Sequence, residues 1–205
     1  MARPKSLRKV RTSKALQGRL RIIGGTWRSR LLPVPAVPGL RPTPDRVRET
    51  VFNWLAPVIE GARCLDLYAG TGALGLEALS RGAGAVVFVD RDPAVLRSLR
   101  ASLETLGCDR GELHCQDAMS YLSGAVSPFD IVFLDPPYRL GMLEPAVTRL
   151  VERDWPAAGA SLYLEHEAGV SSPPLPKGWQ LFRSAAAGQV RYHLARQKAG
   201  AAEDS

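Results

Sequence analysis

The tetrapeptide Asp135-Pro136-Pro137-Tyr138 combines residue types that could bind and orient an amine. The two prolines stiffen the loop and remove two backbone donors, so the Asp135 carboxylate and the Pro136 carbonyl remain as acceptors. Two acceptors can hold both N–H groups of an exocyclic base amine and stabilise the positive charge that develops on its nitrogen during attack on a methyl group. Tyr138 offers a planar face on which a flipped-out base can stack. The loop therefore predicts methyl transfer to a base amine, although a plain proline-rich turn would look the same.

A glycine-rich turn at residues 66–75, Asp-Leu-Tyr-Ala-Gly-Thr-Gly-Ala-Leu-Gly, is the second chemical feature. Gly70 and Gly72 allow a tight turn and a close approach of the backbone to a ligand. The spacing resembles a dinucleotide-binding fingerprint, so a nicotinamide cofactor has to be considered. Asp66 would repel a pyrophosphate but suits the ammonium group of S-adenosylmethionine. We therefore expect S-adenosylmethionine here, with S-adenosylhomocysteine as the product, and Tyr68 in the same site.

Two further acidic residues follow predicted strands. Asp90 lies 20 residues beyond Gly70, a spacing at which a carboxylate can hold the ribose hydroxyls of a nucleoside. Asp117 could accept a hydrogen bond from the adenine amine, with Ala118 offering its backbone N–H to a ring nitrogen. Each carboxylate could instead cap a helix, although Asp92 suits that role better than Asp90. For Asp117 both roles remain open and can coexist.

Strands and helices alternate after residue 61, which is the pattern of a parallel sheet covered on both faces. We expect strands at 64–68, 85–90, 112–115, 131–135 and 161–165, and helices at 73–81, 93–106 and 143–153. Residues 179–184 and 190–195 would form a closing hairpin and place an antiparallel strand at or near one edge. The sequence thus predicts an α/β, Rossmann-like class I methyltransferase fold with seven strands, in which the two chemical loops follow neighbouring strands.

Positive charge is concentrated in the N-terminal quarter of the chain. Residues 1–48 hold 13 of the 27 Lys and Arg residues and one acidic residue, which gives +12 there and −5 in the rest. Such asymmetry points to nucleic acid as the partner, although a solvated tail or an organelle transit peptide would look similar. The residues expected to contact RNA are Arg21, Arg28, Arg30, Arg41, Thr43, Arg46 and Arg48. Some of these arginines could instead pair with acidic residues of the body, and Arg48 could brace the loop at Asp135.

The local patterns divide the chain into four parts. They are a basic flexible tail (1–18), an RNA-binding hairpin and extended segment (19–48), a methyltransferase domain (49–196) and a flexible C-terminal tail (197–205). Short alternating runs around Gly24-Gly25 predict the hairpin, and three prolines keep the next residues extended. A helix then begins near Pro44, with Thr43 as its N-cap. Its apolar stripe is formed by Val47, Val51, Trp54 and Leu55.

Composition argues against several other classes of protein. The three cysteines lack metal-site or disulfide-framework spacing, and Cys64 and Cys115 are expected in the core. His114, His166 and His193 are scattered and predict no metal site. No apolar run approaches the roughly 18 residues of a membrane helix, and the N-terminus lacks a signal-peptide core. We therefore expect a cytoplasmic protein that does not contact membranes.

Four segments together resemble the RsmD family of bacterial enzymes, which methylate guanine N2 in 16S ribosomal RNA. They are residues 21–28, residues 40–53 with the stretch Arg-Pro-Thr-Pro-Asp-Arg-Val-Arg-Glu, residues 66–82, and residues 135–138. Many amino-methyltransferases share the Asp-Pro-Pro-Tyr motif, whereas the arginine-rich stretch is more specific to the family. The resemblance covers residues from about 19 to 195.

The resemblance implies that the target is guanine 966 in ribosomal RNA numbering. It implies that Asp135 and Pro136 accept the amine and that Tyr138 stacks on the base. It also places five residues around S-adenosylmethionine: Asp66, Gly70, Gly72, Asp90 and Asp117. The expected partner is 16S ribosomal RNA, within an assembling small subunit, and the simplest expectation is a monomer without a metal.

Two other functions stay open at this point. Adenine-N6 methylation of DNA or RNA uses the same chemistry, and only the resemblance over residues 41–53 separates it from guanine methylation. A non-catalytic RNA-binding protein of ribosome assembly is the other alternative. The intact glycine turn and the intact Asp-Pro-Pro-Tyr loop argue against it.

Overall fold

A computed structural model of the chain describes residues 18–35, 37, 40, 42–138, 141–169 and 173–198. The expected tails at 1–18 and 197–205 lie outside the described residues, except for Gly18, Gln197 and Lys198. The elements in chain order are β1 (Arg19–Arg21), β2 (Leu31–Pro33), α1 (Asp45–Leu55), β3 (Arg63–Asp66), α2 (Ala73–Ser80), β4 (Ala85–Asp90), α3 (Pro93–Leu106), β5 (Gly111–Cys115), α4 (Ala118–Leu122), β6 (Phe129–Leu134), α5 (Leu143–Glu152), β7 (Pro156–Glu167), β8 (Trp179–Ala187) and β9 (Val190–Gln197).

Seven strands form one sheet in the order β5-β4-β3-β6-β7-β9-β8. The pairs from β5 to β7 are parallel, while β9 runs antiparallel to both β7 and β8. This confirms the predicted α/β class and the antiparallel strand next to one edge. Because β3 and β6 are neighbours, the glycine-rich turn and the Asp135 loop leave the sheet side by side.

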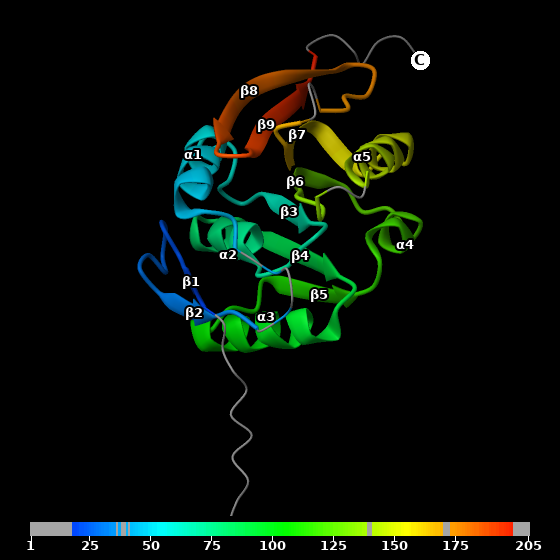
Figure 1. Cartoon of the computed structure of the whole chain (residues 1–205). Coiled ribbons are helices and arrows are strands. Elements are labelled where there is room, and N and C mark those ends of the chain that lie inside the picture. The colour runs from blue at the N-terminus through cyan, green and yellow to red at the C-terminus, as the bar shows by residue number, and fades with distance from the viewer. Residues whose placement is uncertain are drawn as a thin grey trace, which may run out of the picture.

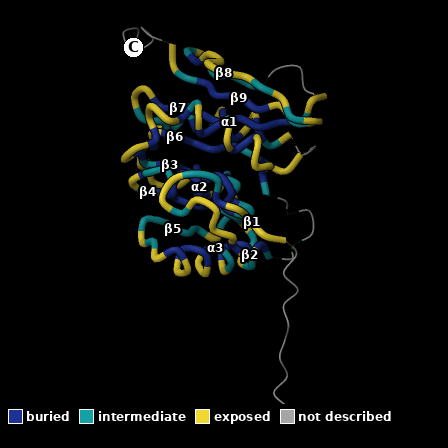
Figure 2. Tube along the Cα trace, turned by 90° about the vertical axis from the view of Figure 1, so that its left-hand side faces the viewer, coloured by how far each residue is buried: buried dark blue, intermediate teal, exposed yellow. Residues whose placement is uncertain are grey.

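The sheet has a hydrophobic core on each face. One core joins the sheet to α1, α2, α3 and the β1–β2 hairpin, and the other joins it to α4 and α5. Figure 1 shows these two groups of elements on opposite sides of the strands. In Figure 2 the central strands are buried, whereas β8 at the edge is mostly exposed. Both cores hold the strand ends in fixed positions, which is what the site requires.

The predicted elements are largely confirmed, with some differences in length. The strand at 85–90 and the helix at 93–106 have the predicted bounds. The strand predicted at 161–165 extends over Pro156–Glu167, because its pairing with β9 continues to Glu167 and Val190. Gln197 belongs to β9, so the predicted C-terminal tail starts too early.

The basic segment forms the predicted hairpin, since β1 pairs antiparallel with β2. The prediction of Thr43 as N-cap is wrong, because α1 has Pro44 at its cap and no side-chain capping bond. Helix α1 also crosses the boundary drawn between residues 48 and 49. Its buried face includes Arg48 and Phe52 in addition to the predicted aliphatic residues, while Trp54 is partly exposed and stacks on Tyr192.

The fold shows where the cysteines and histidines lie and which of the predictions about them hold. Cys64 is buried as expected, but Cys115 is exposed because it ends β5 at the edge of the sheet. His166 and His193, far apart in sequence, stack on each other across β7 and β9. The part of the chain that the structure describes contains no cluster of three or more His, Cys, Asp or Glu residues with metal-binding geometry. It also contains no helix long and apolar enough to cross a membrane.

Candidate active site

A cavity of about 620 Å³ lies at the carboxyl ends of the central strands. Parallel α/β sheets bind ligands at this edge, where consecutive loops diverge. Its walls include six of the seven residues predicted for the cofactor, namely Asp66, Tyr68, Gly70, Asp90, Asp117 and Ala118. Gly72, the seventh, belongs to the same turn as the residue that precedes α2, but it does not line the cavity. Asp135, Pro136 and Tyr138 line the same cavity, so the fold brings the two chemical loops together.

The glycine-rich turn is held in shape by Asp90. One carboxylate oxygen accepts the N–H of Gly70 at 2.9 Å and the other accepts the N–H of Asp92 at 2.8 Å. Asp92 caps α3 by accepting the N–H of Ala94, as the sequence suggested. Gly72 has φ +75°, and an added Cβ would collide with the Leu99 side chain. Asp90 is therefore anchored at the cavity wall and keeps lone pairs that can accept further hydrogen bonds.

Asp66 and Tyr68 supply the polar groups at the other end of the turn. Asp66 is 3 % exposed and accepts the N–H of Gly75 at 3.0 Å. Burial raises the pKa of Asp66 to about 7, with a smaller rise from Asp90 and an opposing effect of the Gly75 hydrogen bond. The buried Tyr68 hydroxyl has no hydrogen-bond partner among the described residues. A carboxylate that needs a cation and a hydroxyl that needs a partner both fit the amino acid end of S-adenosylmethionine.

Asp117 has both of the features considered for it. It caps α4, because its Oδ1 accepts the N–H groups of Met119 and Ser120. It also lines the cavity together with the buried Ala118. Capping uses one oxygen, so the other carboxylate oxygen can accept a further hydrogen bond.

The Asp135 loop follows β6 and contains a partly buried carboxyl group. Burial and the neighbouring Glu165 and Asp66 raise the pKa of Asp135 well above its usual value. The Thr43 hydroxyl donates a hydrogen bond to Asp135, which opposes that rise. Pro136 is buried, whereas the Tyr138 ring is 44 % exposed and available for stacking.

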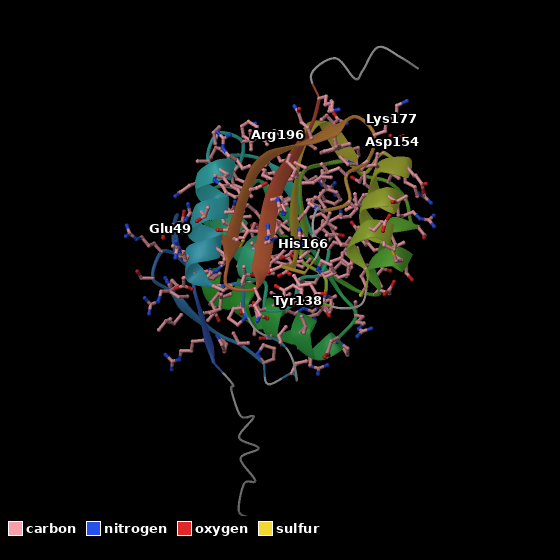
Figure 3. All side chains as sticks on the ribbon, turned by 45° about the horizontal axis from the view of Figure 1, so that its top comes forward. Glu49, Tyr138, Asp154, His166, Lys177 and Arg196 are labelled. Carbon is pink, nitrogen blue, oxygen red and sulfur yellow. The ribbon has the colours of Figure 1, made fainter. Side chains whose placement is uncertain are left out.

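Glu165 and Tyr163 are site residues that the sequence did not reveal. Glu165, on β7, is 3 % exposed and accepts the Tyr138 hydroxyl at Oε1 and the Tyr163 hydroxyl at Oε2. It is also hydrogen-bonded to Asp135. The apolar run of β7 around it indicated a buried position, and a glutamate within that run was the available signal. Figure 3 shows Tyr138 and His166 at one end of the sheet, and Lys177 and Asp154 at the other.

The N-terminal segment contributes to the same cavity. Pro42, Thr43 and Pro44 line it, and Thr43 is 8 % exposed. Its side chain faces Asp135 inside the cavity and not the outer surface of the segment, and the RNA contact of Thr43 stays a prediction.

Arg48 also differs from its predicted role as a phosphate contact. It is fully buried and pairs with Glu77 at 3.2 Å and Asp45 at 2.6 Å. Its Nε donates to the Thr43 carbonyl at 3.1 Å. Arg48 thus supports the loop at Asp135 through Thr43, close to the alternative considered from the sequence, and cannot reach RNA.

Glu77, in the middle of α2, attaches the hairpin to the sheet domain. It accepts the N–H groups of Ile23 at 2.9 Å and Gly24 at 2.8 Å and pairs with Arg81 at 2.8 Å. Arg48 is its fourth partner. A lone Glu within an otherwise apolar helix was the signal for this contact.

The remaining arginines of the segment lie on its outside. Arg21, Arg28, Arg30 and Arg46 are exposed, as phosphate contacts must be. Arg41 lies outside the described residues.

Comparison with known proteins gives close matches over nearly the whole chain. The family described as Conserved hypothetical protein 95 matches residues 20–196. Ribosomal RNA small subunit methyltransferase D of Escherichia coli K12 is 49 % identical over 188 residues, covering 92 % of this chain and 95 % of that protein. The protein of the same name from Haemophilus influenzae is 42 % identical over 194 residues, covering 92 % and 98 %. The solved structure of yhhF from Escherichia coli is 48 % identical, with a TM-score of 0.84 over 89 % of this chain and 99 % of that chain.

Proposed function

Because the chain belongs to the RsmD family, described as Conserved hypothetical protein 95, we propose that it methylates small-subunit ribosomal RNA with S-adenosylmethionine as donor. In finer detail, the proposed target is the exocyclic N2 amine of a guanine in 16S ribosomal RNA, at position 966. The base is flipped out of its loop and held by residues 135–138. The substrate is ribosomal RNA within an assembling small subunit.

A single observation carries this proposal: one cavity is lined both by the cofactor-type turn and by the amine-type loop. Asp66 and Tyr68 fit the methionine end of the donor, Asp90 the ribose, and Asp117 with Ala118 the adenine. When bound, S-adenosylmethionine supplies an electrophilic methyl group on a sulfonium. The protein's contribution is then to place the amine in line with that group, which lowers the entropic part of the barrier.

Asp135 and Pro136 orient the amine in this proposal. The carboxylate of Asp135 and the carbonyl of Pro136 accept its two N–H groups and direct its lone pair away from both. They also stabilise the charge that develops on nitrogen during transfer. In the empty site burial and Glu165 raise the pKa of Asp135, while the Thr43 hydroxyl opposes that rise and favours the ionised form, which accepts a hydrogen bond at either oxygen. The nitrogen becomes acidic only after transfer, so no strong base is required beforehand.

The exposed arginines of the hairpin provide the proposed RNA surface. Arg21, Arg28, Arg30 and Arg46 extend from the segment whose residues 42–44 line the cofactor cavity. Phosphate contacts there would position the RNA, while the cavity selects the base. Residues 19–48 thus act as an RNA-positioning extension of the methyltransferase domain.

Mass mapping of methylated nucleotides in small-subunit RNA tests the proposal. RNA from cells with and without the protein is digested and compared, and the deletion strain is complemented with wild type or Asp135→Ala. We expect one N2-methylguanine to disappear in the deletion and to return with wild type only. Loss of a methyladenine instead would support the adenine alternative. An unchanged small-subunit RNA would refute the function.

A further inference from the structure

A second cavity lies on the outer side of the Asp135 loop. It has a volume of about 420 Å³, within the range of small-molecule sites. It shares Pro136, Pro137, Tyr138 and Met142 with the cofactor cavity, so the two spaces adjoin at the methyl-accepting loop. Its other walls include Glu165, whose carboxyl group also contacts Asp135. A base stacked on Tyr138 with its amine toward Asp135 would therefore lie next to Glu165.

The surroundings of Glu165 leave its carboxyl group without a cation. None of the four ion pairs among the described residues includes it. The neutral hydroxyls of Tyr138 and Tyr163 donate to it, one on each oxygen, and it shares a further hydrogen bond with the Asp135 carboxyl group. Each carboxylate oxygen can accept a second hydrogen bond. Two adjacent carboxyl groups, Asp135 and Glu165, thus form an acceptor-rich edge suited to a ligand with two adjacent N–H donors.

Guanine and adenine differ at this edge. Guanine carries an N1–H donor beside its N2 amine, whereas N1 of adenine, beside its N6 amine, is an acceptor. A carboxylate would accept the guanine N1–H but face the lone pair of adenine N1 with its own negative charge. Sites built to bond a particular polar group discriminate strongly against analogues that cannot supply it.

We propose that Glu165 accepts the N1–H of the target guanine while Asp135 accepts an N2–H, which makes Glu165 the residue that selects guanine over adenine. The inference rests on the proposed function, since it concerns the same bound base. The hydrogen bond between the two carboxyl groups in the empty site is replaced by the two N–H donors of guanine, and the proton they shared leaves to solvent. The Tyr138 hydroxyl donates to the same Glu165, so this residue positions the stacking ring as well as recognising the base.

The test uses 2-aminopurine, which keeps the amine at carbon 2 but has an acceptor at N1. Small subunits are reconstituted with ribosomal RNA that carries guanine, 2-aminopurine or adenine at the mapped target, and kcat/KM for transfer of labelled methyl from S-adenosylmethionine is measured. Wild type should prefer guanine over 2-aminopurine by about 100-fold, the order expected for a hydrogen bond to a charged group. Glu165→Gln can donate its amide N–H to N1 of 2-aminopurine, so the preference should fall to below about threefold or reverse.

Tyr138→Phe is the matched control, since it removes the hydroxyl from Glu165 but keeps the carboxylate and the ring. It should lower kcat while leaving the guanine preference within about threefold of wild type. Equal losses on both bases in Glu165→Gln would show a merely structural role and overturn the inference. If that variant does not fold, the wild-type ratio alone decides, and a preference below about tenfold overturns it. These results differ from failure of the proposed function, in which wild type leaves the guanine unmethylated or modifies the adenine.

Discussion

Two buried glutamates, Glu77 on α2 and Glu165 on β7, lie in contrasting surroundings. Glu77 is fully buried, but it receives two arginines and two backbone N–H groups. Glu165 is almost as buried, yet its neighbours are two tyrosine hydroxyls and a second carboxyl group. Burial alone therefore does not distinguish a structural carboxylate from one in a ligand site.

The difference lies in the balance of charge around each group. Removing a charge from water is costly unless opposite charge and hydrogen bonds replace the water. At Glu77 these partners come from the protein itself, so the contact fixes the hairpin to α2. At the tips of β6 and β7 the protein supplies too few donors, which leaves an acceptor-rich site for a ligand.

The largest effect is expected at the acceptor-rich site. Asp135→Ala should lower the single-turnover rate of methyl transfer by about 10³-fold, because an acceptor for the developing charge is lost. Affinity for S-adenosylhomocysteine, measured by calorimetry, should stay within about threefold, because Asp66, Asp90 and Asp117 remain. The exposed Asp109→Ala serves as the control. Undiminished transfer, or a collapse of cofactor binding, would contradict the role assigned to Asp135.

The second effect compares the two glutamates directly through the free energy of unfolding in urea. Glu77→Gln should cost about 3 kcal/mol, because it removes the buried carboxylate that Arg48 and Arg81 share and leaves buried Arg48 only the exposed Asp45 as an ion-pair partner. Glu165→Gln should change stability by less than about 1 kcal/mol, since no cation loses a partner and the amide can still hydrogen-bond the Asp135 carboxyl group and the two tyrosine hydroxyls. Glu104→Gln, on the exposed face of α3, is the neutral control. Equal losses at both glutamates would remove the contrast.

A third effect concerns pH and the cofactor. The pKa of Asp66 is raised to about 7 in the empty site, so the group is neutral below that pH and ionised above it. Only the ionised form attracts the ammonium of S-adenosylhomocysteine. The Kd should therefore be constant above about pH 7.5 and rise by up to about tenfold for each pH unit below 7. Calorimetry from pH 5.5 to 8.5 measures this change, and Asp66→Asn should bind weakly with a flat profile. A flat profile in wild type would exclude Asp66 as the ammonium partner.

The smallest effects should come from the exposed arginines. Replacing Arg21, Arg28 and Arg30 together by Ala should reduce the salt slope of RNA binding by about 2, since each phosphate contact contributes about 0.7 to 0.9. Arg149→Ala on α5, across the sheet from the hairpin, should leave the slope unchanged. Filter binding at several salt concentrations provides the slope. An unaltered slope in the triple variant would assign these residues to structure instead.

The parts of the site that could be predicted from the sequence are those that depend on local backbone geometry. The glycine turn, the Asp92 cap and the stiff Asp135 loop are each made within a few residues, so their types and spacing were informative. The Arg48–Glu77 pair joins residues 29 apart, and the Tyr138–Glu165 contact joins residues 27 apart. Such contacts depend on which face of α1 and β7 meets the neighbouring element. The position of Arg48 on the apolar stripe of α1 indicated a buried side chain. Its basic surroundings in the sequence led instead to the prediction of an RNA contact.

The wall of the cofactor cavity formed by Pro42, Thr43 and Pro44 has a thermodynamic consequence. The same short segment leads back to the hairpin with its exposed arginines, so RNA bound at those arginines and donor bound in the cavity, as proposed, would both stabilise one placement of that segment. Their binding free energies are then linked, and the linkage is reciprocal: whatever factor RNA adds to donor affinity, the donor adds to RNA affinity. Titrating S-adenosylhomocysteine with and without bound RNA gives that factor. Equal affinities in the two titrations would mean that the two binding sites are not coupled.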